Sequence, residues 1–183
     1  MQIQGLIYIS NFISEEEEKS LIHQIDNATW LNDLKRRVQH YGYKYDYQKR
    51  KIDASMKIGD LPDWIENLAI SIYEKGYIPY KADQVIVNEY LAGQGIAHHI
   101  DCEPCFDDTI ASLSLGSFCT MEFISKDKTL KSEIFLEPQS LLIMADEARY
   151  EWLHGIKAKK SDIIEGKKKV RDRRLSLTFR KIK

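Results

Sequence analysis

The residues whose types and spacing best suit metal chemistry are His99 and Asp101, two positions apart, and His154, much later in the chain. Residues i and i+2 of a β-strand point to the same face, so the imidazole and the carboxylate of this His-x-Asp pair can converge on one ion. Two histidines and one carboxylate form the facial triad of non-haem iron sites, which leaves positions open for oxygen and a bidentate co-substrate. A His-x-Asp pair alone is common by chance, but the three residues together predict a ferrous iron site.

A second group of chemically useful residues lies at 174–180, which reads Arg-Leu-Ser-Leu-Thr-Phe-Arg. On a strand, Arg174 and Arg180 share one face with Ser176 and Thr178, while the apolar residues between them share the other face. An unpaired guanidinium near a protein interior is costly, and the fork of an arginine matches a carboxylate. The pattern predicts either a bound dicarboxylate or an edge strand with two solvated arginines.

Asn88 and Tyr90 offer further hydrogen-bond donors a short distance before His99. On a strand they share one face, and each can donate to a carboxylate. The alternative interpretation is an ordinary strand with one polar face.

Two helices precede the segments that carry these residues. Ser14 and Glu17 match a capping box, which predicts a helix from the acidic cluster at 15–18 to about residue 26. A second helix is predicted to begin near Pro62 and to end near Gly76, because apolar residues recur there at helical spacing. Residues 1–10 alternate apolar and polar side chains and predict a strand.

From residue 84 onward, short β-rich runs alternate with turn signals. The runs cover 84–90, 97–101, 109–115, 119–124, 132–137, 140–144, 149–156 and 174–180. Short strands after two helices predict an α+β fold, a double-stranded β-helix (jelly roll) with N-terminal helices packed on one sheet. We expect a single domain over 1–183, with the helices in 1–83 and the jelly-roll core in 84–183.

The composition suits a chain with a sizeable core, because 43% of the 183 residues are hydrophobic and 30% are charged. With a net charge of −1, attraction to nucleic acid has to come from local patches. No run of roughly 18 apolar residues and no basic leader occurs, so neither a membrane span nor a signal peptide is expected. We expect a monomer in the cytoplasm, or in the nucleus if the source is eukaryotic.

Three cysteines, Cys102, Cys105 and Cys119, do not form the even set of a disulfide framework. Cys102 and Cys105 form a Cys-x2-Cys pair beside Asp101, but a structural zinc needs four ligands and no second pair exists. We expect free thiols. An intermolecular zinc or a redox disulfide is the alternative.

Five segments, taken together, resemble the AlkB family of dioxygenases in order and spacing. They are residues 88–90, 95–101, 113–117, 147–155 and 173–180. The resemblance implies a dioxygenase that uses iron(II), 2-oxoglutarate and oxygen to hydroxylate a C–H bond; on an N-methyl group the product breaks down to formaldehyde and the bare base. It also implies a substrate-covering lid within 1–83.

The resemblance further implies roles for individual residues, with one departure from the family pattern. The implied iron ligands are His99, Asp101 and His154, and the implied 2-oxoglutarate residues are Asn88, Tyr90, Arg174 and Arg180. Arg174 is the expected partner of the distal carboxylate. Ser176 stands where repair-type members often carry asparagine, which leaves that minor contact in doubt.

Nucleic acid is the substrate class that the remaining residues favour. Residues 35–51, at the position of the family's lid, carry seven basic residues and alternating tyrosines, from which we expect Tyr41 and Tyr43 to contact substrate. The alternative is a hairpin whose tyrosines pack on the core. Residues 157–174 are also rich in basic residues and are expected to cover the site entrance, unless they form a flexible solubilising loop.

Two further residues are predicted to contact the substrate, Glu103 and Arg149. A carboxylate at Glu103 would favour a cationic methylated base, although it could equally be a turn residue. The predicted function is oxidative demethylation of 1-methyladenine or 3-methylcytosine in single-stranded DNA or RNA. The alternative is tRNA wobble-uridine hydroxylation, because residues 39–43 and 113–117 look most like the AlkB-like domain of eukaryotic enzymes with that activity.

Overall fold

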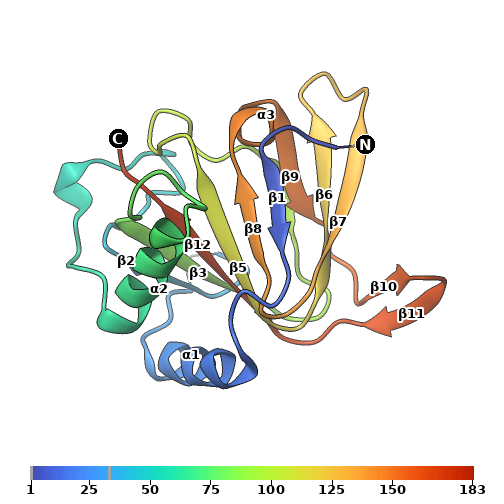
Figure 1. The fold of residues 1–183 in the computed structure, drawn as a ribbon, viewed down its shortest axis with the longest axis horizontal. Coiled ribbons are helices and arrows are strands. Elements are labelled where there is room, and N and C mark those ends of the chain that lie inside the picture. The colour runs from blue at the N-terminus through green and yellow to red at the C-terminus, as the bar shows by residue number, and fades with distance from the viewer. Residues whose placement is uncertain (1, 33) are drawn as a thin grey trace.

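The computed structural model describes residues 2–32 and 34–183, whose strands build two antiparallel sheets and one hairpin (Figure 1). The larger sheet contains, in spatial order, β1 (Leu6–Ile9), β8 (Leu141–Met144), β5 (Ile110–Gly116), β12 (Arg174–Arg180), β3 (Gln84–Tyr90) and β2 (Val38–Tyr41). The smaller sheet contains β4 (Ile96–His99), β9 (Trp152–Ile156), β6 (Cys119–Ser125) and β7 (Lys131–Leu136). This arrangement confirms the predicted double-stranded β-helix.

Both predicted helices form, and they pack on one face of the larger sheet. Helix α1 (Glu15–Asn27) has the capping box of Ser14 and Glu17, and α2 (Asp63–Glu74) begins after Pro62. A single buried cluster joins the apolar residues of both helices to the outward-facing residues of β3, β5, β8 and β12; it includes Ile25, Ile65, Ile72, Val87, Leu113 and Leu177. Helix packing therefore closes one face of the sheet to solvent and leaves the other face for the site.

The alternation of residues along β12 has the predicted consequence. Leu175, Leu177 and Phe179 are buried in the core beneath the helices. Arg174, Ser176, Thr178 and Arg180 line a cavity on the opposite face of the same sheet. That cavity lies against residues of the smaller sheet, including His99 and His154. The polar face of one strand is thus enclosed between the two sheets of the jelly roll.

Three parts of the chain differ from the sequence expectation. A short helix, α3 (Asp146–Tyr150), stands where a strand over 149–156 was predicted, and β9 begins only at Trp152. Asp146 and Glu147 in the first turn and Arg149 in the last turn complement the helix dipole. The strand predicted over residues 1–10 forms as β1, but the larger sheet, expected from residues 84–183 alone, also takes in β1 beside β8 and β2 beside β3.

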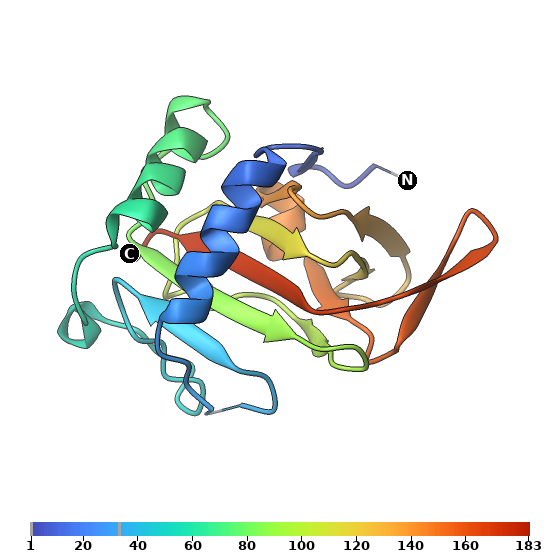
Figure 2. The same ribbon diagram turned by 90° about the horizontal axis from the view of Figure 1, so that it is seen from below.

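The third difference concerns residues 157–174, which were expected to be a loop over the site entrance. They form the hairpin of β10 (Ser161–Ile164) and β11 (Lys167–Val170), which projects from the end of the molecule opposite α2 (Figures 1 and 2). Glu165 and Gly166 make its turn with φ angles of 51° and 75°. The buried ion pair of Arg171 with Asp162 anchors the base of the hairpin.

In the part of the chain that the structure describes, no helix is long and apolar enough to cross a bilayer.

Candidate metal and co-substrate site

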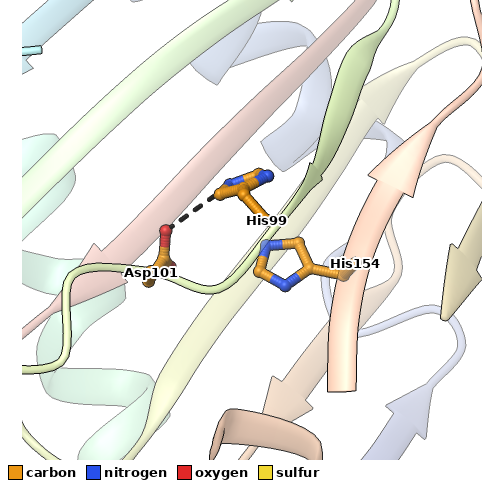
Figure 3. Close-up of side chains that lie close together, drawn as sticks. All are labelled: His99, Asp101 and His154. Carbon is orange, nitrogen blue, oxygen red and sulfur yellow. Dashed lines mark ion pairs between the residues drawn. The ribbon is translucent and has the colours of Figure 1, made fainter. Parts of the chain in front are cut away.

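His99, Asp101 and His154 come together between the two sheets (Figure 3). One ligand atom from each residue lies within 4.8 Å of the others. His99 and His154 face each other across the β4–β9 pair, with ring centroids 4.4 Å apart. Nε2 of His99 lies 3.7 Å from Oδ1 of Asp101. The predicted triad therefore has the proximity that a shared metal ion requires.

The route by which Asp101 reaches this cluster differs from the one expected. Strand β4 ends at His99, so Asp101 lies in the following loop rather than two positions along a continuous strand. The pairing of β4 with β9 is also irregular between Ile96 and His99. The position of Asp101 is instead fixed by hydrogen bonds from Arg180 to its carboxylate and from Arg149 to its carbonyl oxygen.

The protonation states of the three side chains suit a divalent cation. Nδ1 of His99 lies 2.8 Å from the carbonyl oxygen of Ala97, to which it donates, and this leaves the lone pair of Nε2 free. Burial lowers the pKa of His154 to about 3, so its ring is neutral at physiological pH. Burial alone would raise the pKa of Asp101, but the charge and hydrogen bonds of Arg180, together with His154 and His99, outweigh it and hold that pKa well below its usual range. The Nε2 lone pair of His99, the neutral ring of His154 and the ionised carboxylate of Asp101 supply the kinds of donor found in a non-haem iron site.

The two arginines of β12 have different partners. Arg180 donates from Nε and Nη2 to the carboxylate of Asp101, at 3.2 Å each, and from Nη1 to Gln84 at 3.3 Å. Arg174 donates from Nη2 to Ser114 at 2.8 Å. Its Nε and Nη1 are buried and have no partner among the described residues. Because buried donors are rarely left unpaired, Arg174 fits an anionic group of a ligand in the cavity.

The cavity that contains the triad also reaches Arg174, Asn88 and Tyr90, and its volume is about 260 Å³. Tyr90 is buried, and the guanidinium of Arg174 lies over its ring with Cζ 5.5 Å from the centroid. The amide oxygen of Asn88 accepts a hydrogen bond from Nε of Arg36 at 2.9 Å. One cavity thus joins a metal-binding triad to a guanidinium with free donors, as a bidentate keto acid with a distal carboxylate requires.

The tyrosines of the lid segment, residues 35–51, do not share one strand face as expected. Strand β2 ends at Tyr41, and Gly42 has a φ of 75° that turns the chain. Tyr41 donates to Gln39 and packs edge-on against Trp64 in the helix-side core, away from the cavity. Tyr43 is half-buried and pairs with Lys57 through the backbone. Neither residue lines the cavity that holds the triad.

Tyr45 and Tyr47 are the lid tyrosines that do line this cavity, together with Arg36 and Arg50. Their rings contact each other with centroids 5.1 Å apart. Tyr45 also packs on Phe106, whose own ring lies beneath the guanidinium of Arg180. The alternating tyrosines correctly marked the lid segment as one that supplies aromatic rings to the cavity. The turn at Gly42 determines which of these tyrosines face it.

The two other residues predicted to contact substrate also lie outside this cavity. Arg149 is buried, and its guanidinium donates to the carbonyl oxygens of Asp101, Cys102 and Phe106, at 3.1, 3.4 and 3.4 Å. It therefore organises the loop that carries Asp101. Glu103 belongs to a shallower outer depression beside His99 and lies 3.6 Å from Nζ of Lys126, with about half of its side chain exposed.

The expectation of free thiols at Cys102 and Cys105 is wrong, because the two residues form a disulfide. The turn closed by the hydrogen bond from Cys105 N–H to the Cys102 carbonyl brings their Cα atoms to 5.2 Å. This separation is in the usual range for a disulfide. Cys119 is a buried free cysteine, as expected.

Arg36 is the cavity residue that sequence reasoning missed. It was counted only as one of the basic residues of the lid segment, yet it reaches the face of β3 that carries Asn88 and Tyr90. Arg36 lies just before β2, and the pairing of β2 with β3 that brings it to this face cannot be read from a single sequence.

Comparisons with known proteins agree with this geometry. Residues 27–180 match the family model of the 2OG-Fe(II) oxygenase superfamily. The chain is 35% identical over 206 residues to an "Alkylated DNA repair protein ALKBH8 homolog" of Arabidopsis thaliana, covering all of this chain and 60% of that protein. It is 40% identical over 169 residues to the "tRNA (carboxymethyluridine(34)-5-O)-methyltransferase ALKBH8" of Macaca fascicularis, covering 88% of this chain and 25% of that protein.

The fold has a solved counterpart as well. The structure of OsALKBH1 superposes with a TM-score of 0.75 at 17% identity, covering 99% of this chain and 98% of that one. At this identity the match supports the jelly-roll fold, while the sequence matches carry the family assignment. The chain therefore belongs to the AlkB family of the 2OG-Fe(II) oxygenase superfamily, and it is a dioxygenase that uses iron(II), 2-oxoglutarate and oxygen.

Proposed function

We propose that His99, Asp101 and His154 bind the iron and that Arg174 binds the distal carboxylate of 2-oxoglutarate. The observation that carries this proposal is the pair of buried, unpartnered donors on Arg174 in the cavity that also contains the triad. A keto acid that chelates the metal places its second carboxylate at a distance from it, where a guanidinium fork can bind it.

Asn88, Tyr90 and Arg180 complete the proposed co-substrate site. The amide and the phenol are additional donors on the cavity wall. Arg180 keeps Asp101 ionised and adds positive charge near the metal end of the cavity. When bound, iron(II) and 2-oxoglutarate supply the oxidising chemistry, which hydroxylates a C–H bond of the substrate. The protein's part is to orient both groups and to exclude water from them.

The proposed substrate is nucleic acid, and the proposed reaction is demethylation of N-methylated bases in single-stranded DNA or RNA. Tyr45, Tyr47 and Arg50 line the cavity from the lid side, and aromatic rings beside a guanidinium suit an extruded base with its phosphate. The Arabidopsis relative is named for alkylated DNA repair. The chain spans 60% and 25% of the lengths of the two curated relatives.

Hydroxylation of a tRNA wobble uridine is the second candidate, and the charge of the cavity favours it. Among the described residues that line the cavity, Arg36, Arg50, Arg174 and Arg180 are positive and only Asp101 is negative. Glu103, the carboxylate expected to favour a cationic base, lies in the outer depression instead. A cavity of this charge favours a neutral or anionic base over a cationic one. The macaque relative is named for a carboxymethyluridine of tRNA.

One panel of substrates separates the two candidates. The protein is incubated with iron(II), ascorbate, 2-oxoglutarate and oxygen, together with oligonucleotides that carry 1-methyladenine, 3-methylcytosine or a modified wobble uridine. Demethylation predicts formaldehyde and the mass loss of one methylene from the methylated bases. Hydroxylation predicts the mass gain of one oxygen on the uridine. Succinate formation that no oligonucleotide stimulates would contradict both assignments.

A further inference from the structure

Arg36 extends from the lid segment into the proposed co-substrate end of the cavity. Its Nε donates to Oδ1 of Asn88 at 2.9 Å, and its Cζ lies 5.6 Å from the centroid of the Tyr90 ring. It is also one of the residues that line the cavity containing the triad. Arg36, which the sequence analysis counted only among the basic residues of 35–51, is thus in contact with two residues of the proposed 2-oxoglutarate site.

The backbone directs Arg36 to this side of the sheet. Val38 of β2 lies opposite Asn88 of β3, and the carbonyl of Arg37 accepts a hydrogen bond from the N–H of Glu89. The side chain of Arg37 lies on the opposite face of β3, where it donates to both carboxylate oxygens of Glu89 at 2.6 and 2.7 Å. Arg36 lies in the bend that precedes Arg37, and its side chain contacts Asn88 and Tyr90 on the cavity side of β3.

Arg36 has no ion pair with any carboxylate in residues 2–32 and 34–183. Among the described residues, no carboxylate lies within ion-pair distance of Arg36 or of Arg174, whereas Asp101 is paired with Arg180. Arg36 and Arg174 both lie against the ring of Tyr90, with Cζ atoms 5.6 and 5.5 Å from its centroid. Two guanidinium groups without carboxylate partners around one ring create a positive region that an anionic ligand would stabilise.

Asn88 is the group through which Arg36 acts. An amide presents one acceptor and two donors, and it can rotate to exchange them. Because Arg36 occupies Oδ1, the Nδ2 donors are left for another partner, and in the described part of the chain no hydrogen bond from Nδ2 is made. A carboxylate of a ligand would accept from those donors but would be repelled by the amide oxygen in the reverse orientation.

We propose that Arg36 is a positioning residue for 2-oxoglutarate, which fixes the Asn88 amide with its donors toward the co-substrate and adds positive charge beside the carboxylate that Arg174 binds. This inference rests on the co-substrate site proposed above. It makes the affinity for 2-oxoglutarate depend on the lid segment, because Arg36 belongs to that segment while Asn88, Tyr90 and Arg174 belong to the sheet.

The test is a calorimetric titration of 2-oxoglutarate into protein loaded with manganese(II), which binds the co-substrate without turnover. Arg36→Gln should raise the Kd about tenfold, the loss expected for one charge-assisted hydrogen bond. Arg36→Lys, which keeps the charge, should fall between Arg36→Gln and wild type. Asn88→Asp, which keeps an acceptor for Arg36 but loses the Nδ2 donors, should also weaken binding. Lys35→Gln removes a neighbouring exposed charge and should leave the Kd unchanged.

A double-mutant cycle separates positioning from a general structural effect. If Arg36 acts through Asn88, the loss in the Arg36→Gln/Asn88→Ala protein will be smaller than the sum of the two single losses. Additive losses, or a wild-type Kd in Arg36→Gln, would overturn the inference while leaving the co-substrate site intact. Absence of binding in the manganese-loaded wild type would reject the proposed site itself, and the inference with it. Melting curves of all variants show whether each one is folded at the titration temperature.

Discussion

Arg180 and Asp101 form a forked ion pair in which the guanidinium donates to both carboxylate oxygens, at 3.2 Å each. The pair joins the end of β12 to the loop after β4, two segments that are distant in sequence. Both side chains are about nine-tenths buried. The same contact therefore positions a proposed metal ligand, keeps it ionised and ties the larger sheet to the loop beside the smaller one.

Loss of Arg180 should damage stability and metal binding together. In Arg180→Met the carboxylate of Asp101 stays buried without its partner, and breaking such a pair costs about 3–5 kcal/mol. The pKa of Asp101 should rise, so manganese(II) affinity should fall more steeply toward acidic pH than in wild type. Urea unfolding and metal titration at two pH values measure the two effects. If adding Asp101→Asn to Arg180→Met restored no stability, the unpaired charge of Asp101 would not be the cause of the lost stability.

Arg174→Lys tests the fork that binds the distal carboxylate. Lysine keeps the charge but offers a single ammonium in place of two parallel N–H donors, so the KM for 2-oxoglutarate should rise at least about tenfold. The kcat at saturating co-substrate should change much less, because Arg174 does not contact the triad. Initial-rate kinetics with varied 2-oxoglutarate give both constants. An unchanged KM would remove Arg174 from the co-substrate site.

Arg149 should behave as a structural residue rather than as a substrate contact. In Arg149→Met the carbonyl oxygens of Asp101 and Phe106 lose their donor, whereas the Cys102 carbonyl keeps its bonds from the N–H groups of Cys105 and Phe106. Each buried acceptor left unpaired costs about 1–3 kcal/mol, so we expect a lower midpoint of urea unfolding and weaker metal binding. A direct substrate contact would instead raise the KM for the oligonucleotide in a protein of normal stability, and that result would restore the role expected from the sequence.

The features that depend on a local sequence pattern could be predicted from the sequence. The alternation along β12 correctly separated Arg174 and Arg180 from Leu177 and Phe179, because a two-residue period is a property of any strand. The helix after Ser14 formed as predicted, because its capping box satisfies the first-turn N–H groups locally.

The incorrect expectations involve contacts between distant segments. The lid tyrosines were assigned to one face, but the turn at Gly42 ends the strand, so Tyr45 and Tyr47 line the cavity in place of Tyr41 and Tyr43. Arg149 looked available to a substrate because its acceptors in the 101–107 loop are unknown until the chain is folded. Neither the neighbours of the lid tyrosines nor the acceptors of Arg149 can be identified from the residues next to them in the sequence.

The ion pairs of Glu89 with Arg37 and Arg173 should make the free energy of unfolding depend on pH. Its hydrogen bond from Arg37 lowers the pKa of Glu89 despite the opposing effect of burial, and Arg173 adds to the lowering. A carboxyl with a lower pKa in the folded state stabilises the fold above its unfolded pKa, and this contribution is lost as the pH falls through the folded pKa. Glu89→Gln should therefore cost about 2 kcal/mol at neutral pH.

The difference between wild type and Glu89→Gln should shrink below about pH 4, where the carboxyl becomes protonated and resembles the amide. Urea unfolding at several pH values measures it. The exposed pair of Lys57 with Asp60 provides a control, since Asp60→Asn should cost much less. A cost for Glu89→Gln that is the same at pH 3 and pH 7 would exclude the ion pairs as its source.

The most direct test of the proposed site is an anaerobic titration of 2-oxoglutarate into the iron(II)-loaded protein, followed by visible absorbance. Chelation of ferrous iron by a keto acid produces a charge-transfer band, so the wild-type band should saturate at one co-substrate per chain. The band should be absent in Asp101→Ala, which lacks a ligand, and should need more 2-oxoglutarate in Arg174→Lys. A band of equal intensity in Asp101→Ala, or no band in the wild type, would contradict the assignment of His99, Asp101 and His154 to the iron.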